Sequence, residues 1–321
     1  MPLCVIAQPI HEAGVAALRA AGVDVRVADA PDLDTLAAQI SPAQAVLIRD
    51  ALPAWVMDEA PDLKVIANHG TGTDAVDVAH ATARGIPVVY TPQSNVQAVA
   101  EHALMLMLAT ARKAAAADAA TRSADWGFKY RYDLFSLWGK TLGIIGYGHT
   151  GRWLARMAAG GLGMRVRVWS PSAPPGSVDG VERVDTLREL LESADVVSLH
   201  RPLRADTRHT LDAQSLAWLR PHALVINTSR GGLIEEQALV AALRQGRIAG
   251  AGLDVFEQEP LPQGHALAEL PNVVLTPHIA GSTVEALRET ALQCAQGIID
   301  VLVHGRRPQT LRNPEVWPSG S

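Results

Sequence analysis

The sequence predicts an α/β protein of two doubly wound parallel-sheet domains, of the Rossmann or flavodoxin-like kind, with a cleft between them. Short apolar segments alternate with helical stretches along the chain, which favours a parallel sheet covered by helices on both faces. A glycine-rich G-x-G-x-x-G segment starts only at residue 146, so a complete structural unit precedes it. The length of 321 residues suits about two domains.

The first domain is expected to contain five short strands separated by helices. Apolar runs place these strands at 3–7, 23–27, 45–48, 64–67 and 87–90. A single long helix is then predicted from 94 to 123. The first half of this helix is apolar nearly all round, which is typical of a helix buried between layers or between subunits.

The second domain is expected to contain six strands, which suits a complete nucleotide-binding domain. They are predicted at 142–145, 166–169, 196–199, 223–227, 250–255 and 273–276. A last helix at 282–305 is long enough to return to the first domain. We therefore assign residues 1–96 with 287–321 to a substrate-binding domain and residues 97–286 to a dinucleotide-binding domain.

Composition excludes several classes of function. A net charge of -5 without a basic stripe argues against a nucleic-acid partner. The two cysteines, Cys4 and Cys294, exclude a disulfide framework and favour a reduced, cytoplasmic setting. Neither cysteine stands near another metal-type ligand in the sequence, so we expect both to be buried and expect no metal site. No apolar stretch approaches the roughly 18 residues that a membrane span requires.

The segment after the strand at 142–145 has the spacing of a dinucleotide-binding turn. Gly146 makes the tight turn, Gly148 lets the backbone approach a pyrophosphate, and Gly151 allows close packing of helix on strand. The N-terminus of the following helix then faces the anion. Alone, this motif is a weak signal.

Three reactive side chains follow successive strands of the second domain. Arg230, Glu259 and His278 come after the strands at 223–227, 250–255 and 273–276. An arginine can bind a carboxylate through two parallel hydrogen bonds, a histidine can exchange a proton near neutral pH, and a carboxylate can stabilise the imidazolium. Each of them alone is more often an ordinary surface or loop residue. Together, at the strand ends of one nucleotide domain, they suit carbonyl reduction beside a nicotinamide.

Six motifs over about residues 3–310 resemble the D-isomer-specific 2-hydroxyacid dehydrogenase family, and the overall pattern is similar to its phosphoglycerate dehydrogenase and hydroxypyruvate/glyoxylate reductase branches. The motifs are NHGTGTDAVD at 68–77, TPQSNVQAVAEHAL at 91–104, TLGIIGYGHTGRWLA at 141–155, NTSRGGLIEEQAL at 227–239, GLDVFEQEP at 252–260 and TPHIAGST at 276–283. The resemblance implies that Arg230, Glu259 and His278 are the catalytic residues.

The resemblance also implies the contacts of cofactor and substrate. Cofactor contacts are expected from Thr71, Gly146, Gly148, His149, Thr150, Gly151, Ser170, Arg201, Thr228, Ser229, Asp254 and Gly281. Substrate contacts are expected from Arg49, His69, Gly70, Thr71, Gly72 and Arg230. The backbone N–H groups of the glycine-rich loop at 69–72 would hold the substrate carboxylate. Taken alone, this loop also reads as a simple turn.

Two departures from the family pattern bear on ligand choice. Ser170 stands where NAD-using members carry an acidic residue that binds the adenosine ribose, so we expect NADP to be tolerated beside NAD. Arg201 is a candidate to grip the 2′-phosphate, and equally a plain exposed cation. No cluster of cations accompanies Arg49, so a small unphosphorylated 2-ketoacid such as glyoxylate or hydroxypyruvate is preferred over phosphoglycerate.

The sequence therefore predicts an NAD(P)-dependent enzyme that interconverts a 2-ketoacid and a D-2-hydroxyacid. The alternative is a non-catalytic nucleotide-sensing or corepressor protein on the same fold. The apolar helix from residue 94 and the resemblance favour a homodimer. We expect neither a membrane nor a nucleic-acid partner.

Overall fold

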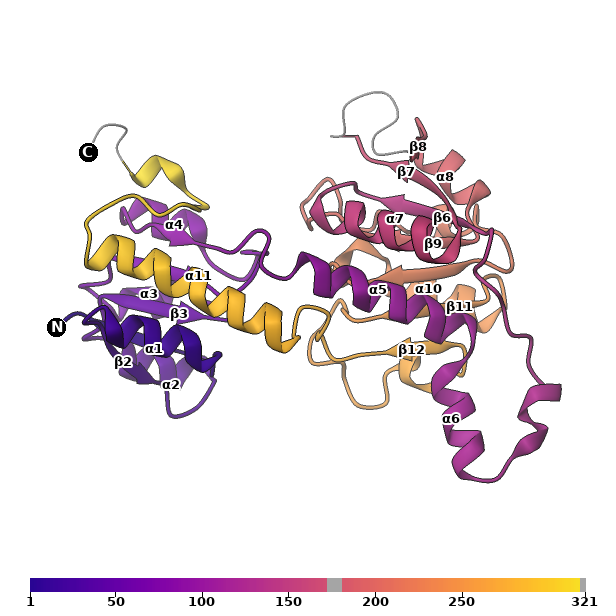
Figure 1. Cartoon of the computed structure of the whole chain (residues 1–321), viewed down its shortest axis with the longest axis horizontal. Coiled ribbons are helices and arrows are strands. Elements are labelled where there is room, and N and C mark those ends of the chain that lie inside the picture. The colour runs from indigo at the N-terminus through magenta and orange to yellow at the C-terminus, as the bar shows by residue number, and fades with distance from the viewer. Residues whose placement is uncertain (172–180, 318–321) are drawn as a thin grey trace. The chain divides into compact units, whose positions relative to one another are not determined.

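The computed structural model describes residues 1–171 and 181–317, which fall into two compact units (Figure 1). Unit 1 comprises Met1–Asn95 and Ser282–Ser321, and unit 2 comprises Val96–Gly281. Each unit is built on a sheet whose strands all pair in parallel, with helices between the strands. The predicted α/β class with two parallel sheets is confirmed.

Unit 1 holds a five-stranded sheet in the order β2-β1-β3-β4-β5, the flavodoxin-like order. Its strands are β1 (Leu3–Ile6), β2 (Asp24–Val27), β3 (Ala45–Ile48), β4 (Val65–Asn68) and β5 (Val88–Val89). Its helices are α1 (Glu12–Ala20), α2 (Leu33–Ile40), α3 (Ala54–Asp58), α4 (Val78–Ala83), α11 (Val284–Leu302) and the 3-10 turn η4 (Pro314–Val316).

Helix α11 completes unit 1 although it comes from the far end of the chain. It packs along α1 and against β4, as Figure 1 shows. Cys4 on β1 and Cys294 on α11 are fully buried in the apolar cluster between them, as expected. Burial raises the pKa of the Cys4 thiol to about 12 and raises that of Cys294 further. Both thiols are therefore protonated packing groups.

Unit 2 holds a seven-stranded sheet in the order β12-β11-β10-β9-β6-β7-β8. Its strands are β6 (Thr141–Ile145), β7 (Arg165–Trp169), β8 (Glu182–Arg183), β9 (Val196–Leu199), β10 (Leu224–Asn227), β11 (Gly250–Leu253) and β12 (Val273–Leu275). Its helices are α5 (Val96–Ala111), α6 (Ala114–Arg122), α7 (His149–Leu162), α8 (Leu187–Ser193), α9 (Ala213–Leu216) and α10 (Glu236–Arg244), with 3-10 turns η1 (Trp126–Tyr130), η2 (Gly231–Leu233) and η3 (Ala266–Glu269).

The strand order of unit 2 reverses between β6 and β9. This is the topological switch point at which open α/β sheets bind their ligands. The glycine-rich turn leaves β6 there, and the segment with Arg201 leaves β9 beside it. Two apolar clusters, one on each face, fill the space between this sheet and its helices. Among the described residues no helix is long and apolar enough to cross a membrane.

The sequence prediction was wrong at two places in unit 2. The single helix expected at 94–123 is two helices, α5 and α6, because Lys113 adopts a left-handed backbone with φ of 51°. The backbone N–H of Phe135 donates to the carbonyl of Ala111 and so satisfies an end group of α5. The described part of the sheet has seven strands instead of six, because the two-residue β8 pairs with β7.

Gly297 on α11 offers a test of how closely unit 1 is packed. A Cβ atom at this position would lie 2.5 Å from Cγ1 of Val89 on β5. We expect Gly297→Ala to lower the free energy of unfolding by about 1–3 kcal/mol, since overpacking outweighs the better helix propensity of alanine. Denaturant titration measures the change. Because Val89→Ala removes the clashing methyl groups, the double variant should lose less than the sum of the two single losses.

Candidate active site

Three loops leave neighbouring strands of unit 2 at the same edge of the sheet. Asn227 pairs with Leu253, and Leu253 pairs with Leu275, so β10, β11 and β12 end level with one another. The loops after these strands carry Arg230, Glu259 and His278. The sheet register therefore brings together the three residues predicted to be catalytic.

The Arg230 turn is fixed by the last residue of β10. The Asn227 side-chain amide donates to the carbonyl of Arg230 at 2.8 Å, and its oxygen accepts from the N–H of Ser229 at 3.0 Å. The next residue, Gly231, packs against the following loop so closely that a Cβ atom would lie 1.9 Å from the carbonyl carbon of Phe256. Only glycine permits this approach, which holds the Arg230 turn against the loop that leads to Glu259.

Glu259 and His278 form an ion pair with a defined geometry. Oε2 of Glu259 lies 2.7 Å from Nδ1 of His278, while Oε1 accepts from the N–H of Phe256 at 3.0 Å. The His278 side chain is 52% exposed, so its other ring nitrogen is accessible to a small molecule. The arrangement is that of a histidine oriented by a carboxylate for proton transfer.

The ion pair shifts the pKa values of both His278 and Glu259. The hydrogen bond that His278 donates to Glu259 raises the pKa of His278 above its usual value, against the effects of burial and of the Arg230 charge. Burial would raise the pKa of Glu259, but the hydrogen bonds from His278 and Phe256 outweigh it and leave that pKa below its usual value. The positive charge of Arg230 opposes the rise in the pKa of His278 and adds to the fall in the pKa of Glu259.

The backbone at His278 is held in an unusual conformation. His278 has a φ of 53°, in the left-handed region that favours glycine. Its N–H donates to the carbonyl of Asp254 at 2.9 Å. The Asp254 side chain is wholly buried, and its oxygens accept from the N–H groups of Ile279 and Ala280 at 2.9 and 2.8 Å. Asp254 was expected to contact a cofactor; in the structure its carboxylate binds the loop that carries His278.

The glycine-rich turn after β6 has the shape of a phosphate cradle. A Cβ atom on Gly146 would lie 2.6 Å from the carbonyl oxygen of His200, and one on Gly151 would lie 2.6 Å from that of Gly146. A Cβ atom on Gly148 would meet no described atom within 4 Å, so this backbone faces open space. His149 and Thr150 begin α7 directly after it. The turn therefore fits a pyrophosphate at a helix N-terminus.

The neighbouring strand ends supply further groups that suit a dinucleotide. The hydroxyl of Thr228 is buried without a hydrogen-bond partner among the described residues, so it is available to a ligand. The hydroxyl of Ser229 donates to the carbonyl of Arg201 at 2.6 Å and so joins the loops after β9 and β10. The Arg201 guanidinium lies over the ring of Trp169, 5.0 Å from its centroid. Ser170, directly after that tryptophan, is buried.

The residues predicted to contact substrate, apart from Arg230, lie in unit 1. Arg49 follows β3 and His69 follows β4, which are paired strands. Burial and then the Arg49 charge lower the pKa of His69 to about 4, so this imidazole is neutral. Asn68 donates to the carbonyls of Gly70 and Gly72 and shapes the loop, while Thr71 donates to Asn95 at 2.9 Å. The contacts proposed for these residues and for Gly281 stay predictions.

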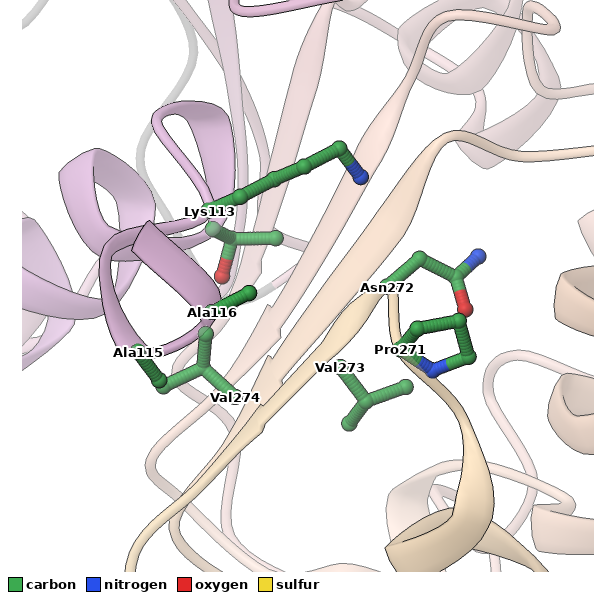
Figure 2. A pocket seen from close by; sticks show the side chains of 8 residues that line it. Lys113, Ala115, Ala116, Pro271, Asn272, Val273 and Val274 are labelled. Atoms are coloured by element: carbon green, nitrogen blue, oxygen red, sulfur yellow. The ribbon is translucent and has the colours of Figure 1, made fainter. Parts of the chain in front are cut away.

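The sequence analysis did not single out His102 or Thr276, although both contact Asp254. Nε2 of His102 lies 2.9 Å from the Thr276 hydroxyl, which donates to Asp254 at 2.5 Å. The one sequence signal that could have indicated His102 is its polar imidazole within the apolar helical stretch 96–111. A small pocket of unit 2 lies apart from these residues. Figure 2 shows Lys113, Asn272 and Val273 among the residues that line it. Asn272 and Val273 stand at the amino end of β12, away from the three loops at its other end.

Comparison with known proteins places these features in a family context. Residues 104–280 match the family model described as D-isomer specific 2-hydroxyacid dehydrogenase, NAD binding domain. This matched region contains the glycine-rich turn, the Arg230 turn, Glu259 and His278.

Relatives match over most of the chain. A D-3-phosphoglycerate dehydrogenase of Mycobacterium bovis is 39% identical over 93% of this chain, which spans only 56% of that relative. A glyoxylate reductase of Thermococcus litoralis is 40% identical over 86% of this chain and 85% of its own length. The crystal structure of an NADPH-dependent glyoxylate/hydroxypyruvate reductase from Sinorhizobium meliloti, in complex with NADP and malonate, aligns with a TM-score of 0.85 at 31% identity, covering 97% of this chain and 96% of that one.

The pair of His278 and Glu259 predicts a titration that does not depend on any activity. Glu259→Gln removes the charge that raises the pKa of His278, so this pKa should fall and less imidazolium should remain at neutral pH. NMR titration of the histidine ring signals measures it, with the His278 signal assigned by its loss in His278→Ala. Glu257→Gln is the matched control, because Glu257 pairs with His209 instead. An unchanged His278 titration in Glu259→Gln would contradict the assignment.

Proposed function

Because this chain belongs to the D-isomer-specific 2-hydroxyacid dehydrogenase family, we propose that it is an NAD(P)-dependent oxidoreductase that interconverts a small 2-ketoacid and the corresponding D-2-hydroxyacid. The observation that carries this proposal is the ion pair of His278 and Glu259 beside Arg230 at the strand ends of unit 2. These are the acid–base and anion-binding groups that carbonyl reduction needs. Retention of all three argues against a protein that only senses nucleotides.

The substrate class follows from the small number of cations expected around it. The region after β3 offers Arg49 but no cluster of basic residues to hold a phosphate. A relative of similar length is a glyoxylate reductase, and a similar solved structure is a glyoxylate/hydroxypyruvate reductase. Glyoxylate or hydroxypyruvate is therefore the preferred ketoacid.

The proposed mechanism assigns one task to each residue. Arg230 binds the substrate carboxylate with two parallel hydrogen bonds and polarises the adjacent carbonyl. Protonated His278, oriented through Nδ1 by Glu259, gives the Nε2 proton to the carbonyl oxygen as it becomes a hydroxyl. Glu259 stabilises the imidazolium before the transfer, and the reverse reaction returns the proton to His278. A bound nicotinamide supplies or accepts the hydride.

The edge near β7 supports the use of NADP as well as NAD. Ser170 places no carboxylate of its own where the adenosine ribose is expected, so this side chain does not repel a 2′-phosphate. Arg201 is stacked on Trp169 at the adjoining strand end, and the charges of Asp206 and Arg204 both act on its guanidinium. We assign to Arg201 the contact with the 2′-phosphate.

A homodimer in the cytoplasm remains part of the proposal. Helix α5 and the segment that follows it, with α6 and η1, carry several exposed large apolar side chains. They are Met105, Leu108, Trp126, Tyr130, Tyr132, Leu134 and Trp138. An apolar group of this kind is typical of a surface that another protein covers.

The decisive assay measures turnover of a panel of 2-ketoacids, glyoxylate and hydroxypyruvate among them, with NADH and with NADPH. We expect turnover of the small ketoacids, and His278→Ala should lower kcat by about a hundredfold or more, the scale for loss of a general acid. His209→Ala is the matched control, because His209 is also paired with a glutamate and should be dispensable. Tight nucleotide binding without turnover of any ketoacid would favour the non-catalytic alternative.

Cofactor choice is tested by binding, independently of turnover. Ser170→Asp should weaken NADPH relative to NADH by on the order of tenfold, because the new carboxylate repels the 2′-phosphate. Arg201→Ala should also weaken NADPH selectively. The matched control is Arg156→Ala, since Arg156 is likewise stacked on a tryptophan, Trp153. Calorimetry yields the dissociation constants of NADH and NADPH for the wild-type protein and for each of the three variants. Wild-type protein that prefers NADH by more than about tenfold, or 1.4 kcal/mol, contradicts the Ser170 argument.

A further inference from the structure

The loop from Thr276 to Ala280 needs an external support to hold His278 in place. A left-handed backbone is unfavourable for a residue with a side chain, so it persists only when the surrounding contacts impose it. Asp254 provides these contacts, because its carboxylate binds the N–H groups of both residues that follow His278. The position of His278 thus depends on where the Asp254 carboxylate is held.

The carboxylate is itself held by a relay of two side chains. The Thr276 hydroxyl donates its proton to Oδ1 of Asp254 at 2.5 Å, so its oxygen is free to accept a second bond. Nε2 of His102 lies 2.9 Å from that hydroxyl oxygen and 3.4 Å from Oδ1 of Asp254. With the hydroxyl proton already given to Asp254, His102 must be the donor, which places a proton on its Nε2.

The relay connects a rigid element with the loop. His102 lies on α5, the helix that packs against β10, β11 and β12. The His102 side chain is only 13% exposed. Burial would raise the pKa of the Asp254 carboxyl, but the bonds from His102, Thr276 and the two N–H groups outweigh it and leave that pKa below its usual value. The carboxylate is therefore charged inside the fold, and each of its donors matters.

We infer that His102 and Thr276 are positioning residues for the acid–base histidine: acting through Asp254, they fix the loop so that Nδ1 of His278 meets Glu259. The inference rests on the proposed function for its catalytic consequence, but its geometric part concerns unit 2 alone. Loss of the relay frees the Asp254 carboxylate to turn, relaxes the loop and loosens the ion pair.

The test compares apolar with conservative replacements. His102→Leu removes the donor, whereas His102→Gln restores an N–H at the position of Nε2. In the same way, Thr276→Val removes the hydroxyl and Thr276→Ser keeps it. Thr110→Val is the matched control, because Thr110 is a buried threonine of the same helix whose hydroxyl has no partner among the described residues. Melting curves confirm that each variant is folded.

We expect the pKa of His278, measured by NMR titration, to fall toward its ordinary value in His102→Leu and in Thr276→Val. In these two variants kcat for ketoacid reduction should fall by roughly ten- to a hundredfold, the scale for a displaced catalytic group, while the Kd for the nucleotide stays nearly constant. His102→Gln, Thr276→Ser and Thr110→Val should stay close to wild type in both measurements.

Two results would overturn the inference: an unchanged His278 titration in both apolar variants, or equal impairment of the apolar and conservative variants. If His102→Leu does not fold, the Thr276 pair decides. The titration also separates this inference from the proposed function. A wild-type protein without reductase activity would refute the proposed function, whereas the pKa of His278 would still report whether the relay holds the loop.

Discussion

The parallel register of the seven-stranded sheet is the constraint on which the candidate site depends. It ends β10, β11 and β12 level with one another, so the loops with Arg230, Glu259 and His278 start from one edge. Backbone contacts then refine what the register provides. Gly231 allows the loop with Arg230 to contact the loop with Glu259, and the Asp254 carboxylate binds backbone N–H groups of the loop with His278. The chemistry of three distant residues is thus set mainly by main-chain geometry.

Much of this arrangement could be predicted from the sequence because its signals are local. A short apolar run predicts a buried parallel strand, and a reactive residue just after such a run lies at the edge where these folds bind ligands. Arg230 and His278 follow that rule directly. The spacing of the glycines at 146, 148 and 151 was an equally local signal. The structure gives its physical reason, because Gly146 and Gly151 leave no space for a side chain and Gly148 faces open space.

The remaining features arise from contacts that no local pattern announces. The break between α5 and α6 falls at Arg112 and Lys113, which are neither glycine nor proline and stand beside a run of alanines. The stacking of Arg201 on Trp169 joins two separate strand ends. His102 and Thr276 are 174 positions apart in the sequence, and a hydrogen bond joins them in the fold. No pattern in the segment around either residue indicates that contact. Such pairs follow from tertiary packing and not from periodicity.

The two buried cysteines have a practical consequence for following the unfolding of this protein. Both thiols belong to unit 1, and the sequence places none between residues 96 and 281. Because only the thiolate reacts with alkylating reagents, thiols that are buried and protonated stay inert while unit 1 is closed. The rate of labelling therefore reports the opening of unit 1 alone, so the chain carries a built-in reporter for one of its two units.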